Sequence, residues 1–432
     1  MIMHKYISFF TALLLSICSL LYGCFDKCIV FFLLVYCWRE GKRDGHWYSP
    51  YYLLCVSLAS YIFYVPSIIP GYLTVLSVKT KILVVSCFCM LIIGFVVARR
   101  SGIKSIIEKE GNATSFWPLF IIGVIPTVVS YMQSGLSLNA ESRAFVEAKE
   151  QFVLPIVGQL MFFLPASIIV ACKKNNYFAA VFAVLISLLA AFVTITKMQI
   201  LIVVIFSLMA FTRFSPPILH GSFFRFLKML SLVLIPIFMI SAFNRNNIIR
   251  NDAASASKMD YMEKGKVDVR YERTASLESA FLNYLYFSTP WANLEYNVKN
   301  NKEVGYGRNS FGQFGKFVGL KVASVHKKNR YIFNTHTFIT DYYIDFGYIG
   351  AIIASFILGW LIYFCYRRYG LSNAPPFIAF YCLIMNATIM LFFSNHFNNG
   401  YLLNGFVLFG GYYLLSGIVR LNSRRSYVRI GD

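Results

Sequence analysis

The chain has 432 residues, of which 58% are hydrophobic and only 14% are charged, and its mean hydropathy is +0.60. A soluble domain has about a quarter charged residues, so these values exclude one large soluble core and indicate an integral membrane protein. The formal net charge of +21 does not indicate nucleic-acid binding, because the basic residues punctuate hydrophobic runs in the way that topology signals do.

The predicted elements, taken in chain order, are mostly hydrophobic segments of the length that crosses a bilayer as a helix. They predict an all-α polytopic membrane protein with about twelve transmembrane helices. The segments 27–38 and 198–212 are short for a span, so tilt or re-entry is an alternative for both. The twelve segments are 6–23, 27–38, 51–69, 80–98, 116–133, 152–172, 177–195, 198–212, 223–243, 338–366, 377–395 and 401–419.

Lysine and arginine alternate between the loops that connect these segments. If the N-terminus is cytoplasmic, the inside loops carry basic clusters and the short outside loops carry almost none, as the positive-inside rule expects. This alternation predicts that both termini are cytoplasmic. The inside residues are Arg39, Lys42, Arg43, Arg99, Arg100, Lys104, Lys109, Lys173, Lys174, Arg213, Arg225, Arg367 and Arg368, followed by Arg420, Arg424, Arg425 and Arg429 in the tail.

The sequence thereby divides into nine membrane helices in 1–243, a large extracytoplasmic loop in 244–336, and three helices with a basic cytoplasmic tail in 337–432. The loop contains fifteen Lys and Arg residues against eight Asp and Glu residues, and this excess of positive charge favours an anionic partner. Apolar residues within 270–298 have the spacing of an amphipathic helix lying against the membrane. The glycines of 305–319 mark a turn-rich stretch, where no preceding strand supports a nucleotide site.

The ten cysteines lie in or beside apolar segments, where they are expected as small apolar side chains. Neither a disulfide framework nor a zinc site can be built from their spacing, and the acidic residues are scattered. We therefore expect neither a metal ion nor a cofactor.

The tenth segment begins with a distinctive motif, which reads Tyr343-Ile-Asp345-Phe346-Gly347-Tyr-Ile-Gly350 after a Thr-rich stretch that starts at Asn334. This motif resembles the start of a late helix in the Wzy-type polymerases of O-antigen and capsule repeat units. That family also combines many spans with one large periplasmic loop in the second half. Pairs of Arg and Gly in two predicted periplasmic loops are similar to a further family pattern, namely Arg143 with Gly158 and Arg250 with Gly265.

The resemblance implies a membrane glycosyltransferase of the bacterial inner membrane. It would polymerise oligosaccharide repeat units linked to undecaprenyl pyrophosphate at the periplasmic face, in O-antigen or capsular polysaccharide synthesis, without a nucleotide sugar. Its expected partners are the lipid-linked glycan donor and acceptor, membrane lipids and a chain-length regulator protein, and no nucleic acid.

The chemistry of this reaction selects candidate catalytic residues. A departing lipid diphosphate is stabilised by guanidinium groups, and we expect at least two of five arginines in the site, although each one alone has a solvated alternative. His336 and Asp341 are candidates for taking the proton of the acceptor hydroxyl. Asp341 shares a helix face with Asp345, for which stabilisation by the helix dipole is the alternative. The five arginines are Arg143, Arg245, Arg250, Arg270 and Arg273.

A polar outer loop precedes the last predicted span. Its side chains would contact sugar hydroxyls, and an interfacial turn is the equal alternative. The residues are Asn395, His396, Asn398 and Asn399.

Three other functions remain open on the sequence. An O-antigen ligase-like enzyme would use the same donor with a different acceptor. A transporter or flippase of lipid-linked glycan would carry ionisable residues at mid-membrane and repeated halves, and neither is evident. A scaffold without activity would use the basic loop to bind anionic lipid or polymer.

Overall fold

The computed structural model describes residues 24–69, 71, 73–106, 116–134, 160–193, 197–214, 275–301, 303–311, 335–398, 405 and 409–410. Within these ranges the chain is helical and contains no β-strand, which confirms the all-α prediction there. The predicted segments 6–23 and 223–243 lie outside the described residues, as does most of 401–419.

Among the described residues, three helical stretches are long and apolar enough to cross a membrane. The first is α4 (Val78–Arg100). The second is α15 (Phe338–Cys365), which continues into the π-turn η4 (Tyr366–Gly370). The third is α16 (Pro375–Ile389), which continues into η5 (Met390–Phe392). These three stretches fit a helical membrane protein by their length and composition, and the count of twelve spans stays a prediction.

Most of the other described helices overlap the predicted segments. They are α2 (Phe25–Asp44), α3 (Pro50–Ile62), η1 (Pro66–Ile68), α5 (Phe116–Ser134), η2 (Leu160–Phe162), α8 (Phe163–Lys173), α9 (Tyr177–Val193), α10 (Lys197–Phe214), α13 (Ala275–Asn300) and η6 (His396–Asn398).

Two helix ends differ from the prediction for local reasons. α2 extends well beyond the predicted segment 27–38, and it ends where Gly45 takes a left-handed φ of 75°. α3 stops at Ile62 although the predicted segment reaches residue 69. Pro66 disfavours helical geometry in the residue before it, and a separate 3-10 turn starts there.

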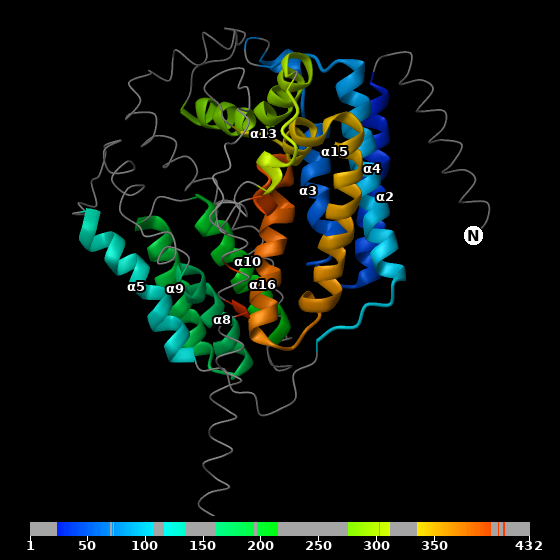
Figure 1. The fold of residues 1–432 in the computed structure, drawn as a ribbon. Helices are drawn as coiled ribbons and strands as arrows, with labels where there is room; N and C mark the ends of the chain where they lie inside the picture. Colours follow the sequence, from blue (N-terminus) through cyan, green and yellow to red (C-terminus); the bar gives the residue numbers. More distant parts are fainter. Residues whose placement is uncertain are drawn as a thin grey trace, which may run out of the picture. The chain divides into compact units, whose positions relative to one another are not determined.

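The described residues fall into two compact units, and unit 1 takes those of Met1–Lys104, Lys258–Arg367 and Ala387–Gly400. In unit 1, α2, α3, α4 and α15 lie side by side and α13 lies at one end of them (Figure 1). We call this end the α13 end, and the opposite end, where Arg99 lies, the Arg99 end.

The α4–α15 contact depends on two glycines. A Cβ atom on Gly94 would lie 2.3 Å from the Phe356 carbonyl oxygen, and one on Gly359 would lie 2.1 Å from the Leu91 carbonyl oxygen. The two backbones therefore touch, which is the close approach that small residues permit between membrane helices.

One face of α15 is apolar and exposed. Large aliphatic side chains recur at every fourth residue along it, with exposed fractions from 72% down to 45%. Such a long exposed apolar stripe is unusual on a soluble protein and suits contact with lipid. The stripe consists of Ile349, Ile353, Ile357 and Leu361.

Unit 2 contains the described residues of Ser105–Ser257, Arg368–Asn386 and Tyr401–Asp432. Its helices α5 and α8 also meet at a glycine, since a Cβ atom on Gly123 would lie 2.2 Å from the Leu164 backbone nitrogen. α9 exposes an apolar face of its own at Phe178, Val181, Leu185 and Leu189.

Candidate functional site

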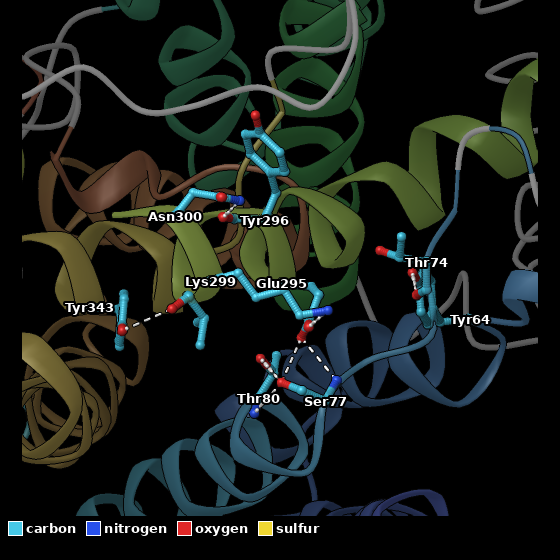
Figure 2. A network of polar contacts seen from close by, with 10 residues as sticks. Tyr64, Thr74, Ser77, Thr80, Glu295, Tyr296, Lys299, Asn300 and Tyr343 are labelled. Carbon is cyan, nitrogen blue, oxygen red and sulfur yellow. Dashed lines mark hydrogen bonds and ion pairs between the residues drawn. The ribbon is translucent and has the colours of Figure 1, made fainter. Parts of the chain in front are cut away.

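Glu295 of α13 fixes this helix to the start of α4 (Figure 2). The side chain is buried, and its Oε2 atom accepts hydrogen bonds of 3.0 Å from both the backbone N–H and the hydroxyl of Ser77. The Lys299 ammonium lies 2.8 Å from its Oε1 atom. Ser77 is itself the N-cap of α4 and accepts from the backbone N–H of Thr80. The carboxylate therefore lies where a negative charge is stabilised by the helix dipole.

The protonation of Glu295 follows from these contacts. Burial raises the pKa of the carboxyl, but hydrogen bonds from Lys299, Thr80 and Ser77 outweigh that effect, and the pKa is lowered below its ordinary value. Glu295 is consequently ionised at neutral pH.

Two further contacts hold α13 against α3, the segment after it, and α4. The Tyr284 hydroxyl accepts from the Val65 backbone N–H at 2.8 Å and donates to a carbonyl oxygen of the same segment. The indole ring of Trp291 is fully buried against Tyr61 and Phe88, with ring centroids 4.9 and 6.1 Å away. The predicted amphipathic helix thus exists as α13, and these described side chains face other helices of unit 1.

α15 is broken at the glycine of the motif Asp345-Phe346-Gly347. Gly347 has φ 70° and ψ −165°, which no α-helix contains, so the carbonyl groups just before it lose their partners in the next helical turn. The backbone N–H of Gly305 donates to the Ile344 carbonyl at 2.8 Å, and that of Tyr306 donates to the Asp345 carbonyl at 2.9 Å. The segment 303–311, which we call the docked turn, therefore satisfies backbone groups that the break exposes.

The Asp345 carboxylate holds the same turn. It is fully buried, its Oδ1 atom accepts from the backbone and side-chain nitrogens of Asn309 at 3.0 Å each, and its Oδ2 atom accepts from the backbone N–H of Ser310. Sequence analysis offered the dipole of its own helix as the alternative role for Asp345. The carboxylate instead binds the amides at the start of the short helical segment within the docked turn.

His336 and Asp341 lie at the α13 end in a buried polar seam. Asn293 of α13 donates to the Thr335 carbonyl at 2.7 Å, and the hydroxyl oxygens of Thr289 and Thr335 are 3.1 Å apart. α13 thereby fixes the chain directly before α15. His336 follows Thr335 and is 7% exposed, and Asp341 in the first turn of α15 is 2% exposed. The structure thus places both predicted residues at one end of one unit.

The segment before the last predicted span also reaches the α13 end. Phe392 stacks on Phe287 of α13, with ring centroids 5.2 Å apart, and Asn395 lies buried beside the phenol of Tyr342. Burial lowers the pKa of His396 to about 4, so its imidazole is neutral at physiological pH. Asn395 and His396 are therefore buried within unit 1, and Asn399 lies outside the described residues.

Two lysines lie at the surface of the α13 end. Lys79 is exposed and lies over the Tyr343 ring, 6.0 Å from its centroid, and the Lys299 side chain is 57% exposed. The Tyr343 hydroxyl donates to the carbonyl of Val298, the residue directly before Lys299 (Figure 2). Tyr343 therefore lies close to both lysines. A surface with this charge attracts anions.

Sequence analysis selected five arginines for the site. Arg143, Arg245, Arg250, Arg270 and Arg273 all lie outside the described residues. Among the described residues, no group of three or more His, Cys, Asp or Glu side chains could hold a metal ion.

Several residues that build the α13 end were missed by sequence analysis. Glu295 and Lys299 have the spacing of an ion pair on a helix, which was the available signal. Nothing local distinguishes Asn293 or Asn309, because their partners Thr335 and Asp345 are far away in the sequence.

Comparisons with known proteins found no match for this chain. No protein-family model matches the chain, and no curated protein or solved structure matches it. The assignment of function therefore depends on the sequence and on the geometry of the α13 end.

Proposed function

We propose that this protein is a membrane glycosyltransferase of the Wzy type, which polymerises repeat units linked to undecaprenyl pyrophosphate at the periplasmic face of the bacterial inner membrane. The observation that carries the proposal is the α13 end itself. There, α13 from the large basic loop is fastened to the segments next to α3 and α4, His336 and Asp341 are buried, and Lys79 and Lys299 are exposed at the surface of the same end.

The charge distribution in unit 1 supports this orientation. The last turns of α2 and of α4, both predicted to be cytoplasmic, meet at the Arg99 end, where the Arg99 guanidinium lies 2.7 Å from the Glu40 carboxylate. The α13 end is opposite and is periplasmic in the proposal. Twelve spans, two cytoplasmic termini and a periplasmic loop at 244–336 belong to the same proposal.

The proposed reaction forms one glycosidic bond and breaks the bond between the anomeric carbon of the donor and its phosphate oxygen. A hydroxyl group of the acceptor glycan attacks the anomeric carbon of the donor, and the undecaprenyl diphosphate leaves with the electron pair of the broken C–O bond. The imidazole of His336 accepts the hydroxyl proton, and Asp341 orients the groups around it. Lys79 and the loop arginines Arg143, Arg245, Arg250 and Arg273 stabilise the charge on the leaving diphosphate.

Deletion of the gene tests the proposal in a strain with long surface polysaccharide. A polymerase deletion leaves single repeat units attached to the carrier or core, and long chains of unchanged length would reject the proposal. Long polymer that accumulates on undecaprenyl pyrophosphate without transfer to core would instead identify a ligase. Complementation with Arg43→Gln, an exposed change at the Arg99 end, serves as the positive control and should restore long chains.

A further inference from the structure

The apolar stripe of α15 does not stop at the helix break. Phe346 lies one turn above Ile349 and is 37% exposed, and the Phe311 ring of the docked turn meets it with centroids 6.4 Å apart. Phe311 and Tyr306 are 64% and 82% exposed. An exposed apolar surface therefore runs from α15 onto the docked turn.

The position of the break agrees with a membrane boundary. The continuous part of α15 after Gly347 has roughly 18 residues and a length of ~27 Å at 1.5 Å per residue, which is close to the ~30 Å thickness of the hydrocarbon core. Gly347 and the docked turn would consequently lie at the depth of the lipid headgroups. Aromatic side chains are enriched at that depth in membrane proteins.

Arg308 lies between the two exposed aromatic residues of the docked turn. Its side chain is exposed, and no ion pair joins it to another described residue. The turn geometry holds the Arg308 backbone in place, because its N–H donates to the Gly305 carbonyl and the next two residues are held by Asp345. An exposed cation on a held backbone, with aromatic residues in the same turn at headgroup depth, has the chemistry that recognises a lipid phosphate.

We propose that the docked turn is a binding site for an anionic membrane phospholipid. The Arg308 guanidinium binds the phosphate of the headgroup, and Tyr306, Phe311 and Phe346 pack against the first carbons of the acyl chains. A soluble anion would leave the aromatic surface unused, whereas a phospholipid contacts both the cation and the apolar stripe below it. The bound lipid fixes the depth of the docked turn, and this inference requires the membrane span of α15 but no glycosyl transfer.

Site-specific photo-crosslinking tests the proposal on the full chain. A benzoylphenylalanine replaces Tyr306, and the protein is placed in nanodiscs of phosphatidylcholine with a minor share of phosphatidylglycerol. Mass spectrometry then identifies the lipid attached to the peptide of the docked turn. We expect phosphatidylglycerol to be enriched in this adduct by about fivefold over its share in the nanodisc, the factor that one basic residue contributes at an anionic membrane surface.

Charge variants in the same turn sharpen the test. Arg308→Gln should lower the share of phosphatidylglycerol in the adduct to its share in the nanodisc. Arg308→Lys should keep most of the enrichment. Glu303→Gln, an exposed change in the same turn, should preserve it. The absence of a lipid adduct at position 306, or equal enrichment in the parent and Arg308→Gln, overturns the proposal.

Two competitors separate this site from other anion sites. Inorganic phosphate should leave the enrichment of phosphatidylglycerol unchanged. If phosphate abolishes this enrichment, the site binds soluble anions instead. Undecaprenyl phosphate at the same mole fraction as phosphatidylglycerol should not displace it. Displacement would overturn the phospholipid assignment in favour of a prenyl phosphate, and neither result depends on whether the protein polymerises glycan.

Discussion

The two ends of unit 1 use their polar residues in different ways. At the Arg99 end, the Arg99 guanidinium lies 2.7 Å from Glu40 and 3.3 Å from Asp44, and the hydroxyls of Ser49 and Tyr363 donate to Asp44. These groups satisfy one another within a closed network. The network joins the ends of α2, α4 and α15.

At the α13 end, the polar residues join the helix bundle to α13 and to the docked turn, which lie outside the bundle. Asp345 binds the docked turn, Glu295 binds the start of α4, and Asn293 binds the chain before α15. Exposed cations remain around them. The difference teaches that one end stabilises the bundle, whereas the other presents loop residues above it, which is where we place the reaction.

The largest expected effect concerns the two buried residues of the proposed reaction. His336→Ala and Asp341→Asn should each reduce glycan polymerisation by at least about a hundredfold, because a general base contributes at least that factor. Chain length of the surface polysaccharide, or transfer between purified lipid-linked repeat units, measures the effect. Normal chain length in His336→Ala, with protein at the parental level, would contradict the assignment of the α13 end.

Removal of the Asp345 carboxylate should release the docked turn. Asp345→Ala leaves several buried donors without an acceptor, and we expect a loss of about 4 kcal/mol in the free energy of unfolding. Hydrogen exchange at residues 305–311 should rise even where the helices stay protected. Asp345→Asn keeps one oxygen acceptor and should show a smaller loss; equal exchange in all three proteins would show that the carboxylate does not hold the turn.

The pH dependence of stability should reveal His396. Its folded pKa of about 4 lies below its ordinary value near 6.5, so the unfolded chain binds a proton more readily between these two values. Stability should therefore be complete above about pH 6.5 and fall by roughly 3 kcal/mol as the pH drops to about 4. Denaturation of His396→Asn over this window should show a shallower slope, and an unchanged slope would assign the acid sensitivity elsewhere.

A smaller effect on the free energy of unfolding is expected for one carboxylate at each end of unit 1. Glu295→Gln removes the charge that binds Ser77 and Lys299, and we expect a loss of about 2 kcal/mol in the free energy of unfolding. Glu40→Gln, whose partner Arg99 is partly exposed, should cost about 1 kcal/mol. The loss at Glu295 should shrink as the pH falls through its lowered pKa, since the contribution of an ionised carboxyl disappears there.

The same pair of variants separates function from stability. At matched protein levels, Glu295→Gln should shorten polysaccharide because α13 is less firmly held, while Glu40→Gln should not. Equal chain lengths in both variants would remove the functional distinction between the two ends.

Sequence analysis predicted the bounds of α4 and α15 closely, but it did not predict the roles of the acidic residues in unit 1. The hydrophobic runs of α4 and α15 were predicted to within a few residues, because the length of an apolar run is a local property. Asp341 and Asp345 were predicted to share a helix face. Asp345 turned out to bind the docked turn, because Gly347 breaks the helix only two residues later.

The sequence by itself determined the membrane class, the helix positions and the alternation of basic loops, because hydrophobic length and charge can be counted along the chain. The tertiary structure alone decided which polar groups meet. Glu295 and Ser77 are 218 residues apart, yet packing brings them within 3.0 Å. The tertiary structure also decided the break of α15 at Gly347. A glycine permits this backbone conformation, but the docked turn supplies the hydrogen bonds that make it stable.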